Sequence, residues 1–218
     1  MVSSFRPPSA SERGFSMIEM LMVVAIIGVL AAISLPMSGN ALRYIKISGD
    51  ARDLSNAAAV AKMRAAAKFT KSRLYVDLTG KTFYIQTYEK NVTAQCPSTA
   101  STPPCWVNEA GTVTSLSSTV SFEYSPVSTP PANTQATIGQ APQCMTLDAT
   151  PVATAGSACI IFNSRGLPIT SITSGSPMGD DALYITDGSA VYGITVAATG
   201  FIRLWRTNAA SSPTWTLQ

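Results

Sequence analysis

Apolar residues are unevenly distributed along this chain, and the longest apolar run lies near its start. Residues 15–37 read FSMIEMLMVVAIIGVLAAISLPM and carry one charged side chain, Glu19. A helix of roughly 23 residues is about 35 Å long, which is enough to cross a bilayer. Residues 1–14 are polar and contain Arg6 and Arg13, which favours keeping this end in the cytoplasm. We therefore predict a membrane-spanning helix at 15–37, with the rest of the chain outside.

The next segment, residues 38–73, shows the spacing of an amphipathic helix that continues the apolar run. Its apolar positions recur at alternating steps of four and three and form one stripe, made of Ile47, Ala51, Leu54, Ala58, Ala61 and Ala65. Most of these residues are alanine, and small side chains allow a sheet to lie close against a helix. The stripe therefore predicts the packing face of the helix.

Beyond this helix the hydrophobic pattern changes to a period of two. A hairpin is expected around Thr79 and Gly80, and Ser, Thr and Pro at 95–142 predict long loops with at least one strand, near Phe122. The sequence thus predicts an α+β fold, in which a long N-terminal helix packs against an antiparallel β-sheet domain at 74–218. The further expected strands are ACIIFNSRG, ALYITD, AVYGITVA and FIRLWR.

Composition and cysteine content point to an oxidising compartment. Charged residues make up only 12% of the chain, which suits an extracytoplasmic domain better than a cytosolic enzyme. Neither cysteine pair has C-x-x-C spacing, and the chain has no histidine to complete a zinc site. Two local disulfides are therefore expected, Cys96 with Cys105 and Cys144 with Cys159. Four buried thiols and the crossed pairing are the alternatives.

Glu19 requires an explanation, because a carboxylate inside a membrane costs roughly 2.5 to 3.5 kcal/mol on insertion scales. A secretory signal peptide cut after VLAA and an uncleaved signal anchor are both compatible with the apolar run, but neither explains the acid. A cut between Gly14 and Phe15 does explain it, because the new α-amine of Phe15 can be neutralised by Glu19 of a neighbouring subunit.

The segment RGFSMIEMLMVVAIIGVLAAISLP resembles the class III signal of type IV prepilins and pseudopilins. The resemblance makes 1–14 a leader peptide that a prepilin peptidase removes after Gly14, and it makes Phe15 the residue that is then N-methylated. Glu19 corresponds to the acid at the fifth mature position, which acts in assembly. Pro36 falls where many pilins bend or melt the first helix.

The C-terminal part resembles the GspH/FimT family of minor pilins and minor pseudopilins. The similarity rests on FNSRG, from Phe162 to Gly166, and on the later ITVAATGFIRLWR. It implies a minor subunit of a type IV pilus or a type II secretion pseudopilus that acts in filament initiation. The implied partners are other pilin subunits, the prepilin peptidase and the inner-membrane assembly platform. The implied location is the bacterial inner membrane, single-pass with a periplasmic domain, and then the filament.

Some members of that family are DNA receptors with a Gly-Arg-x-Arg pattern near the C-terminus, so DNA binding is the alternative function. Here Gly200 is followed by Phe201, and the arginines stand at Arg203 and Arg206. Side chains alternate faces along a strand, so these two arginines are expected on opposite faces unless a bulge intervenes.

A second group of cations gives the DNA alternative independent support. Arg64, Lys68 and Lys71 are spaced to share one helical face that tracks phosphates. A solvated or subunit-facing helix is the alternative explanation.

Enzymatic function has little support in the sequence, which contains no histidine for general base work, no phosphate loop and no cluster of metal ligands. We expect no cofactor and no catalytic residue. The segment MGDDALYITDG places Asp180, Asp181 and Asp187 near one another, which is compatible with Ca²⁺ but is more typical of a polar turn.

Overall fold

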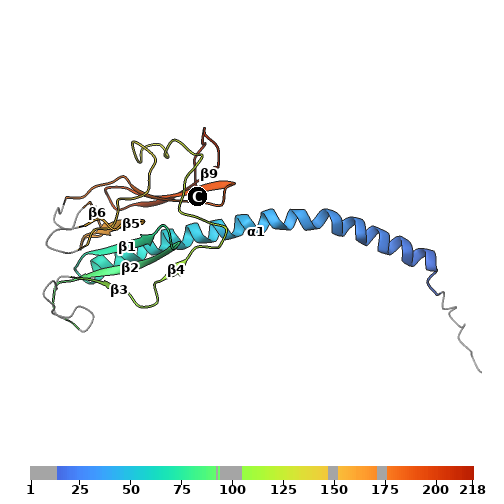
Figure 1. The fold of residues 1–218 in the computed structure, drawn as a ribbon, viewed down its shortest axis with the longest axis horizontal. Coiled ribbons are helices and arrows are strands. Elements are labelled where there is room, and N and C mark those ends of the chain that lie inside the picture. Colours follow the sequence, from blue (N-terminus) through green and yellow to red (C-terminus); the bar gives the residue numbers. More distant parts are fainter. Residues whose placement is uncertain (1–13, 92, 94–104, 147–151, 171–175) are drawn as a thin grey trace, which may run out of the picture. The chain divides into compact units, whose positions relative to one another are not determined.

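The fold is described by a computed structural model for residues 14–91, 93, 105–146, 152–170 and 176–218, with the side chains at 33–38 and 40 left out. The chain divides into two compact units, Met1–Leu42 and Arg43–Gln218. One helix, α1 (Met17–Ala67), begins in the first unit and ends in the second (Figure 1). The second unit contains the β-sheets, so the fold is α+β, as predicted.

The strands of the second unit form two antiparallel sheets. The first sheet has the order β3-β2-β1-β5-β6, with β4 also paired to β2, and the second has the order β10-β9-β8-β7. The strands are β1 (Ser72–Asp77), β2 (Thr82–Glu89), β3 (Cys105–Asn108), β4 (Thr114–Ser115), β5 (Ser157–Phe162), β6 (Pro168–Ile169), β7 (Asp181–Thr186), β8 (Ala190–Val196), β9 (Ile202–Asn208) and β10 (Thr216–Leu217).

The C-terminal part of α1 packs against both sheets through the predicted stripe. In Figure 1 it runs alongside β1 and β2, and its stripe joins a single core cluster with residues of both sheets. Leu74 of β1 and Ile194 of β8 are two of these partners. The six stripe residues are at most 1% exposed: Ile47, Ala51, Leu54, Ala58, Ala61 and Ala65. Their alternating spacing of four and three, with four alanines, therefore identified the packing face correctly.

The hairpin between β1 and β2 forms where the sequence predicts it. Asp77 ends β1, and its Oδ1 accepts hydrogen bonds from the backbone N–H groups of Thr79 at 3.0 Å and Gly80 at 2.7 Å. A carboxylate in this position closes a turn by replacing a backbone acceptor.

The strand predicted near Phe122 is wrong. Its segment makes only an isolated bridge between Ser121 and Thr186, while the side chains of Val120 and Phe122 enter the main core. The apolar residues alternate in this segment because their side chains are buried in the core. They do not form the ladder of hydrogen bonds that defines a strand.

Candidate functional site

The start of α1 presents the peptide bond between Gly14 and Phe15 outside the helix. Both residues precede the first helical residue and are exposed, and the side chain of Phe15 is 76% exposed. The backbone carbonyl of Ser16 accepts the first helical hydrogen bonds, from the N–H groups of Glu19 at 3.0 Å and Met20 at 3.2 Å. The bond predicted for cleavage is therefore accessible and is not held in helical geometry.

Glu19 lies where an acid favours the start of its own helix, which the sequence analysis missed. Ser16 stands at the N-cap and Glu19 three residues later, in the first turn. This is the Ser-x-x-Glu pattern of a capping box, and it is readable from the sequence. An acid in the first turn also interacts favourably with the helix dipole, by about 0.3 to 1 kcal/mol. Stabilisation of the helix start is therefore one reason for an acid at this position, besides the pairing with a neighbouring amine.

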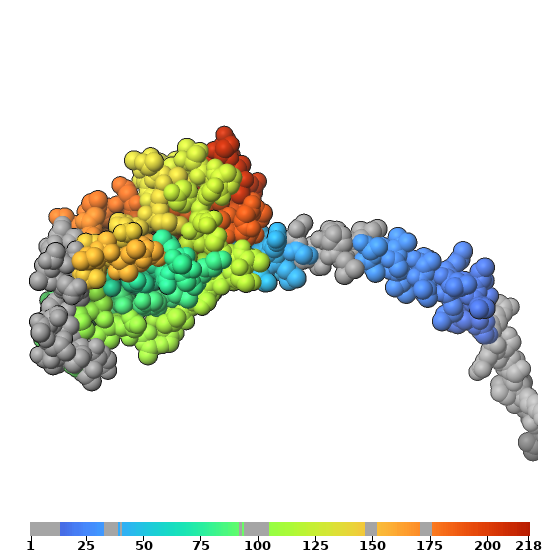
Figure 2. Space-filling model, in the orientation of Figure 1, coloured from blue at the N-terminus to red at the C-terminus, as the bar shows by residue number. Residues whose placement is uncertain are grey.

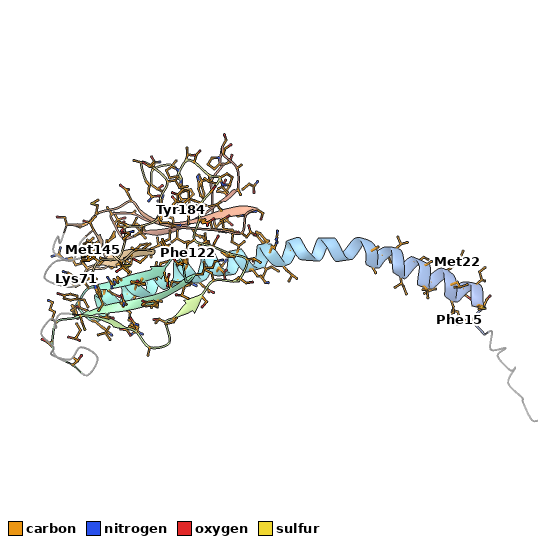
Figure 3. The ribbon with its side chains drawn as sticks, in the orientation of Figure 1. Phe15, Met22, Lys71, Phe122, Met145 and Tyr184 are labelled. Carbon is orange, nitrogen blue, oxygen red and sulfur yellow. A yellow bond between two sulfur atoms is a disulfide. The ribbon has the colours of Figure 1, made fainter. Side chains whose placement is uncertain are left out.

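The N-terminal part of α1 exposes an apolar surface on every side. All described side chains at 14–32 are exposed, and Glu19 is the one charged residue among them. Figure 2 shows these residues as uncovered blue atoms, and Figure 3 shows the side chains of Phe15 and Met22 projecting from the helix. A helix that is apolar all round is normally covered, so this surface requires a partner or an apolar medium.

Among the residues that the structure describes, no helix is long and apolar enough to cross a membrane. The membrane span that the sequence predicts at 15–37 includes 33–37, whose side chains lie outside the described ones, so it stays a prediction. The resemblance also implied a bend or melting at Pro36. Helix α1 remains helical through this position, which contradicts melting, and the bend stays a prediction.

One of the two predicted disulfides lies within the described part of the chain. Cys144 and Cys159 are joined, with 5.0 Å between their Cα atoms, and they pack in a small cluster with Ile161 and Ile169. The bond attaches the long loop before β5 to that strand. The predicted partner of Cys105 is Cys96, which lies outside the described residues.

The cations predicted on one helical face do not share one. Helix α1 ends at Ala67, so only Arg64 of the three lies on it. Lys68 forms an ion pair with Glu109, and Lys71 lies over the ring of Tyr88, 5.4 Å from its centroid. Burial and the charge of a neighbouring lysine lower the pKa of Lys71. The helical phosphate track expected from the spacing is therefore wrong.

The two C-terminal arginines lie on opposite faces of β9, as the alternation of strand side chains predicts. Arg203 is exposed and stands opposite Thr195 of β8. Arg206 is on the other face, where its guanidinium lies over the ring of Tyr44 of α1, 5.3 Å from the centroid. The structure therefore does not combine these arginines into one phosphate-binding surface.

The three aspartates considered for Ca²⁺ divide between the two ends of β7. Asp181 begins the strand, where burial and the charge of Asp180 raise its pKa to about 7. Asp187 follows the strand and closes a turn, accepting hydrogen bonds from the backbone N–H groups of Ser189 at 2.9 Å and Ala190 at 3.0 Å. Within the described ranges, no group of three or more potential ligands is placed to hold a metal.

The two glycines quoted for the C-terminal resemblance meet over α1. A Cβ at Gly200 would lie 2.6 Å from the carbonyl oxygen of Gly166, and Lys62 of α1 donates from Nζ to the carbonyl of Gly200 at 2.9 Å. Both glycines have left-handed backbones, with φ of 73° at Gly166 and 77° at Gly200. These positions therefore serve close packing. Sequence reasoning missed Lys62, because nothing local marks a contact 138 residues away.

Comparison with known proteins agrees with the geometry at the N-terminus. Residues 9–35 match the family described as the prokaryotic N-terminal methylation motif, which includes Gly14, Phe15 and Glu19. No curated protein and no solved structure matches the chain. The start of the chain is thus a type IV pilin-like prepilin signal, which is typical of membrane-anchored, pilus-associated proteins that assemble with other pilins.

Proposed function

We propose that the chain is a minor subunit of a type IV pilus or of a type II secretion pseudopilus, and that it acts in filament initiation and assembly. One observation carries the proposal: the methylation motif at 9–35 coincides with an exposed, non-helical peptide bond at Gly14. The role is that of a structural subunit and not of an enzyme, and it requires no cofactor. The C-terminal resemblance to the GspH/FimT family supports the minor role.

Processing would convert the start of the helix into an assembly site. Cleavage after Gly14 leaves Phe15 with a free α-amine, which the prepilin peptidase then methylates. Glu19 of one subunit pairs with the Phe15 amine of its neighbour. The apolar interior of the filament then holds an ion pair in place of two isolated charges. The exposed apolar side chains at 14–32 supply the remaining contact area.

The proposed location is the inner membrane, with the N-terminus in the cytoplasm and the globular unit in the periplasm, before transfer to the filament by the assembly platform. The Cys144–Cys159 disulfide supports an oxidising compartment for the globular unit. The polar, arginine-containing start of the chain supports the cytoplasmic N-terminus.

Processing is tested by co-expressing the full chain with a prepilin peptidase and measuring the intact mass. The expected product begins at Phe15 and carries one additional methyl group. The matched control is Gly14→Val, which places a branched side chain at the scissile bond and should leave the chain uncut. A mature N-terminus near Ser34 would instead identify a conventional signal peptide and overturn the proposal.

Assembly is tested by comparing two substitutions of Glu19. Glu19→Gln removes the charge but keeps a residue that the capping box accepts, whereas Glu19→Ala removes both. We expect normal cleavage of both variants and poor incorporation into filaments, measured by immunoblotting of sheared filaments. Normal incorporation of Glu19→Gln with loss only in Glu19→Ala would assign the residue to helix capping alone.

A further inference from the structure

One turn of α1, at the start of the second unit, combines exposed cations with exposed apolar side chains. Arg43 and Lys46 are exposed, and between them stand Tyr44 and Ile45, which are 49% and 63% exposed. Residues 43–46 make about one turn, so their side chains leave the helix at the same level in different directions. We call these four residues, together with Arg206 of β9, the basic turn.

Arg206 brings a third cation to this level from the second sheet. Its guanidinium lies over the ring of Tyr44, 5.3 Å from the centroid, which holds it against the helix. Its Nε–H group is buried and has no hydrogen-bond partner in the described part of the chain. Buried polar groups are normally satisfied, so this guanidinium has bonding capacity that the chain itself does not use.

A hollow of about 290 Å³ beside Arg206 leaves part of this side chain accessible. The other residues that line the hollow are neutral, and four of them carry hydroxyl groups: Thr207, Ser212, Thr214 and Thr216. Phosphate oxygens accept hydrogen bonds from hydroxyl groups, and the planar guanidinium of arginine can meet two of them at once. The hollow is therefore suited to a phosphate group.

The basic turn has no neighbouring acid to neutralise it. No acidic residue stands between Glu19 and Asp50 in the sequence, and Asp50 is engaged elsewhere, because it accepts hydrogen bonds from the N–H group of Ser117 at 2.9 Å and from its hydroxyl at 3.1 Å. Within the described ranges the ion pair is that of Lys68 with Glu109, beyond the other end of α1. The three cations at one level therefore lack a counter-ion, and they attract an anion.

The place of the basic turn along the chain points to a membrane as the source of the anion. Tyr44 follows the predicted membrane segment, 15–37, by seven residues, which is roughly 10 Å of helix. The headgroup layer extends roughly 5 to 8 Å beyond the hydrocarbon core, and side chains on a helix tilt toward its N-terminus, which here means back toward that segment. Tyrosine is enriched at membrane interfaces, and long cationic side chains reach the headgroups while their stems cover apolar surface.

We propose that the basic turn binds the phosphate headgroup of an anionic phospholipid, in the membrane that holds the apolar part of α1. Arg206, fixed on Tyr44, meets the phosphate, while Arg43 and Lys46 add an attraction that depends on the net negative charge of the lipid. The proposal rests on the membrane location proposed above and goes beyond it, because it assigns a lipid ligand to the globular unit.

The test uses the full chain in micelles of a neutral detergent, titrated with phosphatidylglycerol or phosphatidylcholine and followed by native mass spectrometry. Both lipids carry a phosphate, but only phosphatidylglycerol has a net charge. We expect phosphatidylglycerol to bind about tenfold more tightly than phosphatidylcholine. Arg206→Gln should weaken the binding of phosphatidylglycerol about tenfold, which corresponds to the loss of one hydrogen bond between charged groups.

The matched control is Arg203→Gln, because Arg203 lies on the same strand with its side chain on the opposite face. It should leave lipid binding unchanged. The double variant Arg43→Gln with Lys46→Gln replaces two exposed side chains, so its Tm should not change while its binding of phosphatidylglycerol weakens. Weaker binding in this variant would therefore not reflect unfolding.

Equal affinity for the two lipids, unchanged affinity in Arg206→Gln or in the double variant, or an equal loss in Arg203→Gln would each overturn the proposal. Displacement of phosphatidylglycerol by inorganic phosphate at about 1 mM would overturn it in favour of a site for free phosphate. Tighter binding of oligothymidylate that is lost in Arg206→Gln would overturn it in favour of a nucleic-acid site. Cleavage of the same variants after Gly14 by a prepilin peptidase tests the proposed function separately, because cleavage does not depend on the headgroup contact.

Discussion

The close contact between Gly200 and Gly166 predicts a large loss of stability for Gly200→Ala. A non-glycine residue in the left-handed region is destabilised by about 1 to 2 kcal/mol. The added Cβ would also lie 2.6 Å from the backbone oxygen of Gly166, so backbone must move, and overpacking of this kind costs about 1 to 3 kcal/mol. We therefore expect Gly200→Ala to lower the free energy of unfolding by about 2 to 5 kcal/mol.

Gly188→Ala is the matched control for this substitution. Gly188 has a similar φ, 85° against 77° at Gly200, but a Cβ there meets nothing within 4 Å. Its destabilisation should be limited to the backbone part, about 1 to 2 kcal/mol. The gain from restricting the unfolded chain is similar for both substitutions and cancels in their difference. That difference, about 1 to 3 kcal/mol, therefore measures the steric contact alone.

The assay is urea unfolding of the full chain in micelles, followed by tryptophan fluorescence. The three tryptophans, Trp106, Trp205 and Trp215, all lie in the globular unit and report its unfolding. The Gly200→Ala midpoint should fall further than that of Gly188→Ala, with an unchanged m-value. Equal losses in the two variants would refute the close approach as the cause.

Three further predictions concern the same unit. Replacing both Cys144 and Cys159 by alanine should lower the free energy of unfolding by about 3 kcal/mol, and an unchanged urea midpoint would contradict this. The pKa of Asp181, about 7, means that the folded state keeps a proton that the unfolded chain releases above about pH 4. Stability should therefore fall as the pH rises from about 4 to 7, and Asp181→Asn should abolish this fall in thermal melts. Lys62→Met should lower the free energy of unfolding by about 1 kcal/mol, because the hydrogen bond from Lys62 to the carbonyl of Gly200 is lost. An unchanged Tm would show that this bond does not stabilise the fold.

Local patterns account for most of the fold that the sequence predicted. The stripe from Ile47 to Ala65 was recognisable because a run of small apolar residues at helical spacing has one common explanation, a closely packed helix face. The hairpin at Thr79 and Gly80 was recognisable because turn residues separate two alternating runs. The end of the helix was misjudged, because the residue that terminates it is Phe69 and not the glycine that normally marks such an end.

The arrangements that depend on distant residues were beyond local reasoning. The contact of Lys62 with Gly200 and the approach of β3 to the end of β2 join segments whose proximity depends on sheet order. The N-terminal site is different, because Gly14, Phe15 and Glu19 lie within six consecutive residues. Chemistry confined to such a short segment is readable from spacing alone, which explains why this site was predicted and the contact of Lys62 with Gly200 was not.

The same short segment also explains why Glu19 is difficult to interpret by a single substitution. A carboxylate three residues after Ser16 stabilises the helix start whether or not a neighbouring amine is present. Loss of filaments in Glu19→Ala alone therefore has two causes that cannot be separated. Glutamine keeps the capping capacity and removes only the charge, so the difference between Glu19→Gln and the unsubstituted chain isolates the ion pair, and the difference between the two variants isolates capping. Because the Ser-x-x-Glu pattern begins at Ser16, Glu19→Gln is the variant that carries the information about assembly.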